Sequence, residues 1–138
     1  MGAAGFRAAA LALMCAGCTS IAVDQRSFEG TRWRVTAING QPTSARGVFF
    51  FEFERGSYSA RMGCNQARGR YRVEGDALVA FGTMTTEMAC DAVPAEPIPL
   101  MTFEEWGFRV LRAPMRMQWK GETGLTLSNA NGSIVLER

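Results

Sequence analysis

The chain has 138 residues, of which 15 are basic and 13 acidic, and it contains no histidine. This near-neutral charge argues against a nucleic-acid partner, and the missing histidine excludes both a Ser/His/Asp triad and a Cys/His nucleophile pair. Only two of the four cysteines, Cys64 and Cys90, lie in the body of the chain, and two thiols without an imidazole are too few for a zinc site. The sequence therefore predicts no metal, no cofactor and no enzymatic activity.

The first 17 residues have the features of an export signal. Arg7 precedes the apolar stretch 8–14, which is much shorter than the roughly 20 residues that cross a bilayer as a helix. Ala16 and Gly17 stand directly before Cys18, and this arrangement resembles the lipobox of bacterial lipoproteins. In that pattern the signal is cut ahead of the cysteine, which then receives acyl chains.

Two outcomes stay open for Cys18. Lipidation would make it the first residue of the mature chain, and two or three acyl chains, at about 0.8 kcal/mol per buried methylene, would anchor the protein stably. Residues 18–26 would then be a tether, and Thr19, where inner-membrane retention signals usually carry Asp, would favour the outer membrane, facing the periplasm. The alternative is an ordinary secretory signal cut near Ala16, which leaves Cys18 as a free thiol.

Export also bears on Cys64 and Cys90, because disulfides persist outside the cytosol. A bridge between them would close a loop with about 25 intervening residues, which the chain-entropy model equates with about 3.5 kcal/mol of stability. We therefore expect a structural disulfide. Without the leader, 121 residues remain, enough for one domain at 27–138, expected to be a monomer.

Period-two alternation of apolar residues predicts a mostly β chain. The expected strands lie at 31–38, 48–54, 57–62, 68–74, 77–81, 115–120, 125–128 and 133–137. Glycine-containing turns such as Asn39-Gly40 separate them. Eight short strands fit a small antiparallel β-barrel, lipocalin-like or cracked, because closure removes exposed strand edges.

One helix is predicted near 102–112. Thr102 and Glu105 have the spacing of a capping box, in which each side chain bonds a backbone N–H of the other's turn. One apolar face follows, formed by Phe103, Trp106, Gly107, Val110 and Leu111, and Pro114 ends the segment. A helix this short is marginal alone, so its apolar face is expected to be buried against the barrel.

A set of motifs spread along the chain is shared with a known family. These are Trp33, Ile38-Asn39-Gly40, Phe51, Gly63-Cys64-Asn65, Tyr71, Phe81-Gly82, Thr86-Glu87-Met88-Ala89-Cys90, Leu125-Thr126-Leu127 and Asn131-Gly132. They resemble the META domain of heat-inducible HslJ-type lipoproteins over about residues 27–138. The resemblance implies a lipocalin-like or cracked barrel with one helix, a place in the bacterial envelope, a link to stress or antibiotic tolerance, and no established enzymatic activity.

Four arginines form a candidate interaction patch: Arg61, Arg68, Arg70 and Arg72. Alternation places the last three on the strand face opposite Tyr71. Guanidinium groups suit phosphates and carboxylates, so lipid headgroups or an acidic envelope protein are candidate partners. The alternative is a solvated face balanced by Glu52, Glu54 and Glu74.

Smaller features also have two interpretations each. Asn65 is either a functional group or a residue that serves a backbone turn. Met84 and Met88 either fill gaps in the core or bind soft copper ions. The aromatic residues either fill the barrel or line a cavity for an acyl chain.

Three classes of function follow. The first is a non-catalytic envelope lipoprotein that acts through protein contact. The second is a carrier or pilot-like chaperone that binds a hydrophobic ligand or segment in the barrel. A small enzyme is last, because histidine and a motif with paired acids are both missing.

Overall fold

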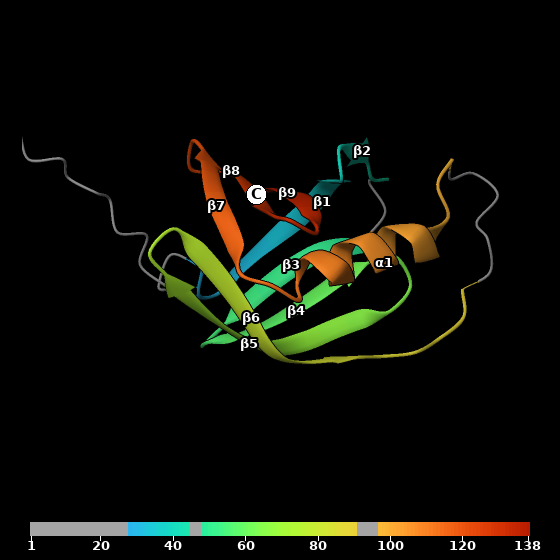
Figure 1. Ribbon diagram of the computed structural model, residues 1–138, viewed down its shortest axis with the longest axis horizontal. Helices are drawn as coiled ribbons and strands as arrows, with labels where there is room; N and C mark the ends of the chain where they lie inside the picture. The colour runs from blue at the N-terminus through green and yellow to red at the C-terminus, as the bar shows by residue number, and fades with distance from the viewer. Residues whose placement is uncertain (1–27, 45–47, 91–96) are drawn as a thin grey trace, which may run out of the picture.

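Figure 1 shows the computed structural model, which describes residues 28–44, 48–90 and 97–138. The strands and the helix are β1 (Thr31–Ile38), β2 (Gln41–Pro42), β3 (Phe49–Glu54), β4 (Ser57–Met62), β5 (Gln66–Glu74), β6 (Ala77–Thr85), α1 (Leu100–Val110), β7 (Met115–Lys120), β8 (Gly124–Asn129) and β9 (Gly132–Glu137). The leader, Cys18 and the predicted tether lie outside the described residues.

Eight antiparallel strands close into a barrel in the order β1-β3-β4-β5-β6-β7-β8-β9, with β9 pairing back onto β1. The short strand β2 extends the ladder of β1 beyond the end of β3. The predicted small barrel with one helix is confirmed. The strand bounds agree with the sequence within a few residues, apart from β2, which was not predicted, and β6, which continues past Phe81 to Thr85.

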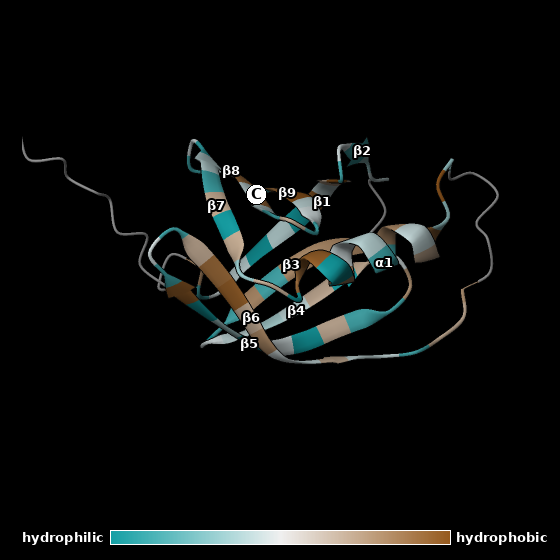
Figure 2. Ribbon diagram, in the orientation of Figure 1, coloured by the Kyte–Doolittle hydropathy of each residue, from teal (hydrophilic) through white to brown (hydrophobic). Residues whose placement is uncertain are grey.

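Figure 2 shows bands of hydrophobic and hydrophilic residues along the strands. The hydrophobic side chains form one buried cluster that fills the barrel interior. Trp33, Phe51 and Phe53 are at most 1 % exposed, and Phe51 stacks on Phe53 with ring centroids 4.8 Å apart. Phe28, just before β1, closes one end, 4.7 Å from the Phe53 ring and 5.6 Å from that of Trp119. Of the two predicted alternatives, the filled barrel is therefore the observed one.

Helix α1 packs against β1, β4 and β9 and buries Phe103, Val110 and Leu111. The ring of Phe103 meets that of Phe49 edge-on at 5.4 Å. The predicted burial of Trp106 was too strong, because this residue lies at the flank of the helix and is only partly buried.

The predicted capping box was wrong. The helix begins two residues earlier than expected, at Leu100, with Pro99 at the N-cap and no side-chain capping bond. The amides of Thr102 and Phe103 donate instead to the Pro99 carbonyl. Proline disfavours helical geometry in the residue before it but is well tolerated in the first turn of a helix. Pro99 therefore defines the start of α1 without a polar cap.

The barrel is weakest where β6 meets β7. These strands share only two residue pairs, Ala77 with Arg116 and Leu78 with Met115. β6 continues to Thr85, but the chain preceding β7 is helix α1 and a short turn, so within the described ranges no strand accompanies the second half of β6 on this side. Figure 1 shows β7 diverging from β6 there, and the barrel is cracked at this seam.

Gly107 allows α1 to approach the sheet closely. A Cβ atom at this position would lie 2.3 Å from Sδ and 3.2 Å from Cβ of Met62, which is fully buried on β4. A glycine inside a helix costs about 1 kcal/mol relative to alanine. The close contact with β4 therefore explains why a glycine stands inside this eleven-residue helix.

We predict that Gly107→Ala destabilises the protein by about 1–3 kcal/mol despite its better helix propensity, because the added methyl group overpacks the contact with Met62. Urea unfolding measures this change. Adding Met62→Ala should make Gly107→Ala less costly than it is in the wild type. A Gly107→Ala variant more stable than wild type would contradict this account of the packing.

Candidate functional site

Asn65, in the loop between β4 and β5, organises the family motifs. Its side chain is 3 % exposed. Nδ2 donates to the Met88 carbonyl at 3.0 Å and to Oε1 of Glu104 at 2.8 Å. Oδ1 accepts from the Met88 amide at 2.6 Å and from Oγ1 of Thr86 at 3.1 Å. Asn65 therefore joins two distant segments, a structural role wider than the local turn considered for it.

Glu104 connects helix α1 to the same loop. Its residue is 7 % exposed, and Oε2 accepts the backbone amides of Cys64, at 3.1 Å, and Asn65. Among the described residues no basic side chain forms an ion pair with this carboxylate. Three N–H donors stabilise the negative charge instead, as a buried polar network requires.

Glu104 was missed by sequence reasoning, although a signal existed. It falls at the fourth position after Leu100 and the third before Gly107, inside the apolar stripe of the helix. Acidic residues are almost never fully buried without partners, so an acid in that stripe indicated a specific set of donors.

The predicted disulfide between Cys64 and Cys90 is confirmed, with Cα atoms 5.8 Å apart. It adds a covalent link between the β4–β5 loop and the chain that follows β6. Gly63 completes the contact, because a Cβ there would lie 2.4 Å from the Leu100 carbonyl oxygen at the start of α1. We call Gly63, Cys64, Asn65, Thr86, Met88, Cys90 and Glu104 the polar clamp.

Trp33 and Ala89 are among the motif residues that lie outside the polar clamp. Trp33 is in the barrel core, where its Nε1 donates to Oγ1 of Thr31 at 2.9 Å. Ala89 is exposed between the clamp residues Met88 and Cys90. The motifs of this chain thus serve mainly to hold the fold together.

Glu104→Gln should destabilise the oxidised protein by about 1–3 kcal/mol, because a glutamine has one acceptor oxygen and its NH₂ group must face an existing N–H donor. Denaturant unfolding measures the loss. Glu105→Gln, at an exposed neighbouring position, is the matched control and should stay within about 0.5 kcal/mol of wild type. Equal stability of the two variants would show that the carboxylate is not needed.

The arginine cluster separates into two parts. Arg68, Arg70 and Arg72 are exposed side by side on the outward face of β5. Arg61, on β4, instead donates its Nε to the Cys64 carbonyl at 3.1 Å. Arg61 therefore supports the polar clamp and is not equivalent to the other three.

Exposed apolar side chains lie beside these arginines. In the β5–β6 register Arg68 faces Met84 and Arg70 faces Phe81, which are 75 % and 41 % exposed. The guanidinium carbon of Arg72 lies 5.1 Å from the centre of the Phe81 ring, and Arg72 also pairs with Glu74. We call Arg68, Arg70, Arg72, Phe81 and Met84 the arginine face.

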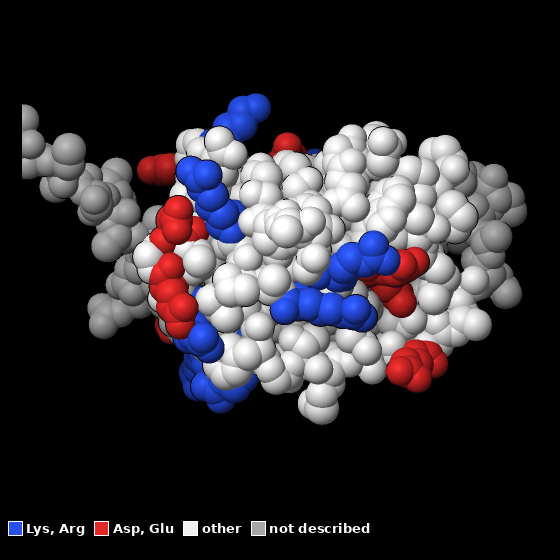
Figure 3. All heavy atoms as spheres, in the orientation of Figure 1, with Lys and Arg blue, Asp and Glu red and all other residues white. Residues whose placement is uncertain are grey.

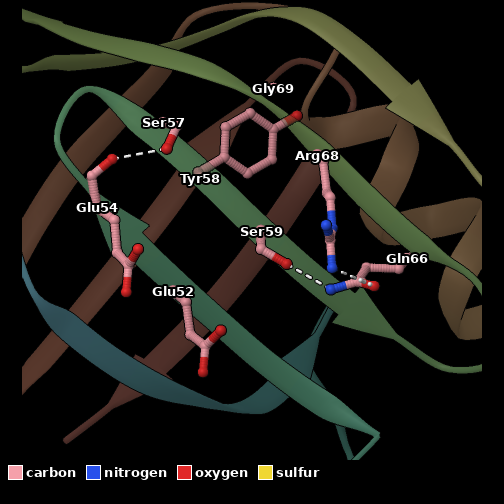
Figure 4. Close-up of a pocket in the computed structure, with 8 residues that line it drawn as sticks. All are labelled: Glu52, Glu54, Ser57, Tyr58, Ser59, Gln66, Arg68 and Gly69. Atoms are coloured by element: carbon pink, nitrogen blue, oxygen red, sulfur yellow. Dashed lines mark hydrogen bonds between the residues drawn. The ribbon is translucent and has the colours of Figure 1, made fainter.

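Acidic residues border this face on the side of β3. A hollow of about 330 Å³ lies here. Figure 4 shows Glu52 and Glu54 across β4 from Arg68. Ser59 and Gln66 are hydrogen-bonded to each other on the floor of this hollow, at 2.6 Å. The charges on the side of the molecule seen in Figure 3 are likewise of both signs.

A second hollow, of about 400 Å³, lies at the seam between β6 and α1. We call it the seam groove, and it is lined by Ala80, Thr83, Thr85, Phe108, Leu111 and Arg112. The hydroxyl of Tyr58 reaches Oγ1 of Thr83 at 2.6 Å. Burial raises the pKa of Tyr58, and the hydrogen bond to Thr83 partly opposes that rise.

The core interpretation of Met84 and Met88 was wrong, because both side chains are more than half exposed. Met84 lies on the outer face of β6 opposite Arg68, and Met88 lies in the segment that follows β6. No group of three or more His, Cys, Asp or Glu residues suited to a metal ion is found in the described parts of the chain. The described α1 is also not a helix that could cross a membrane.

Comparisons with known proteins agree with the motifs and the fold. The family model described as "META domain" matches residues 26–137. A solved NMR structure is similar with a TM-score of 0.67 and 21 % identity, covering 81 % of this chain and 92 % of the other. A second NMR structure, of a protein from Burkholderia xenovorans, has a TM-score of 0.61 and 18 % identity, covering 82 % and 84 %. No curated protein matches this chain.

Proposed function

This chain belongs to the META domain family, and from that premise we propose that it is a non-catalytic lipoprotein of the bacterial cell envelope that acts through contact with another protein. Its role would lie in envelope stress or antibiotic tolerance, as the resemblance to HslJ-type lipoproteins suggests. The anchor would be acyl chains on Cys18, in the outer membrane.

The arginine face is the observation that carries the contact proposal. Arginine, methionine and aromatic residues are enriched in protein interfaces, and lysine and acidic residues are depleted there. The face combines three exposed arginines with Phe81 and Met84 over two adjacent strands. Exposed side chains of this kind fit a partner that offers carboxylates around an apolar centre.

Two features of the chain support a non-catalytic role. The sequence contains no histidine for acid–base work near neutral pH. The polar cluster that the family motifs build, around Asn65 and Glu104, uses its hydrogen-bonding groups on the protein's own backbone. The carrier alternative is less well supported, since aromatic side chains fill the barrel.

Anchoring is tested by Cys18→Ala in cells. We expect the variant either to leave the membrane fraction or to keep its leader uncut, because the acylated residue is also the cleavage site. Membrane fractionation with mass spectrometry of the N-terminus measures both, with Cys15→Ala as the matched control. A Cys18→Ala protein that is processed and still bound to membranes would contradict lipidation.

Contact through the arginine face is tested by placing the photo-crosslinker p-benzoylphenylalanine at Phe81 in the full chain. We expect a salt-sensitive crosslink to an envelope protein that is lost in Arg68→Gln/Arg70→Gln. Arg32→Gln/Arg34→Gln makes the same charge change on β1 and should keep it.

Two results would overturn the proposal. The first is a crosslink that persists unchanged in the β5 double variant. The second is loss of the crosslink in the β5 double variant together with a lipid result. In that result the purified protein binds phosphatidylglycerol vesicles but not phosphatidylcholine vesicles, and the binding depends on the β5 arginines. Lipid headgroups would then be the partner.

A further inference from the structure

The second half of β6 has a free edge. Beyond Leu78 none of the described strands accompanies it on the side of β7, although β5 pairs with it on the other side as far as Thr85. In an antiparallel strand, alternate residues direct their N–H and C=O groups to each side. The stretch from Val79 to Thr85 therefore presents backbone groups that no described strand pairs.

Among the described residues, a single bulge is the protection that this edge has against pairing. Natural proteins guard free edges with charged residues, prolines or bulges. β6 contains no charged residue and no proline, and its outward-facing Phe81 and Met84 are exposed. The bulge lies in β6 itself, where two residues between Phe81 and Met84 oppose one on β5 and Gly82 has a φ of 60°.

The edge is also held in an extended form at both ends. Leu78 pairs with Met115 at one end. At the other, the amide of Thr86 donates to the Gln66 carbonyl at 3.0 Å, and Asn65 binds both Thr86 and Met88. A preorganised edge loses little conformational entropy when another strand pairs with it.

The seam groove adjoins this edge and could receive side chains of an added strand. Its volume of about 400 Å³ is within the range of about 300–1,000 Å³ for ligand pockets. Phe108 and Leu111 supply apolar surface from the helix side. Arg112 is exposed and has no ion-pair partner among the described residues, whereas its neighbour Arg109 pairs with Glu105.

We infer that β6 and the seam groove bind an extended segment of a partner protein by strand addition, with apolar side chains between β6 and α1 and a carboxylate near Arg112. This goes beyond the proposed function, because the groove lies on the inner side of β6 and the arginine face on the outer.

The test selects peptides from a random dodecapeptide display library against the processed, oxidised full chain. Thr85→Trp, which fills the groove from an exposed position, should abolish binding of the selected peptides, and Thr123→Trp on the β7–β8 turn should not. Arg112→Glu should weaken binding roughly tenfold, while the control Arg116→Glu leaves it unchanged. Melting temperatures establish that each variant is folded.

Amide hydrogen exchange of the complex with a synthetic selected peptide gives the signature of strand addition. We expect new protection at alternate residues of β6 on each side of the bulge at Gly82, between Val79 and Thr85, and the same affinity in Arg68→Gln/Arg70→Gln. This control separates the inference from the arginine-face proposal.

Three outcomes would overturn the inference. The first is a selection in which no peptide is enriched on the wild-type chain relative to the Thr85→Trp variant. The second is amide protection by the peptide that falls outside β6. The third is amide protection of β6 that rises with protein concentration when no peptide is present. The last result would mean that a second copy occupies the edge.

Discussion

The hydrogen-bonded pair of Asn65 and Glu104 is the interaction on which the rest of this structure depends. The β4–β5 loop, the chain after β6 and helix α1 meet at these two side chains. Each segment alone is poorly held, because the loop has no ladder partner and a helix of this length is marginal without tertiary contacts. The polar clamp makes the three segments mutually dependent.

This arrangement explains how a barrel with a crack remains a defined structure. Strands β6 and β7 share two residue pairs, so backbone pairing alone scarcely closes the seam. The disulfide and the Asn65 bonds hold the chain after β6 to the β4–β5 loop, and Glu104 holds α1 to the same loop. The seam is thus bridged by side chains rather than by a continuous ladder, which leaves the backbone of β6 free on one side.

Much of the fold could be predicted because its signals are local. In strands such as Thr31–Ile38, apolar and polar residues alternate with period two. The pairing of Cys64 with Cys90 was predicted from the expected export of the chain and from their being the two cysteines outside the leader. The helix start was missed because the capping-box pattern of Thr102 and Glu105 placed it at Thr102. The helix begins at Leu100 instead, with Pro99 at the N-cap and no side-chain capping bond.

The candidate sites were harder to predict, because their roles depend on what covers a side chain. Nothing local distinguishes Met84 on an open seam from a methionine in a core. Arg61 looked equivalent to the β5 arginines until its bond to the Cys64 carbonyl placed it with the polar clamp. Non-local contacts decide such cases, and one sequence does not contain them explicitly.

Native-state hydrogen exchange in denaturant is the most direct measurement of the central claim that the polar clamp is part of the cooperative core. The account predicts that the amides of Cys64, Asn65 and Met88, which donate into the clamp, exchange only through global unfolding, as the β1 core amides do. If these three amides exchanged through low-energy local opening while β1 stayed protected, the clamp would be peripheral and the account would be contradicted.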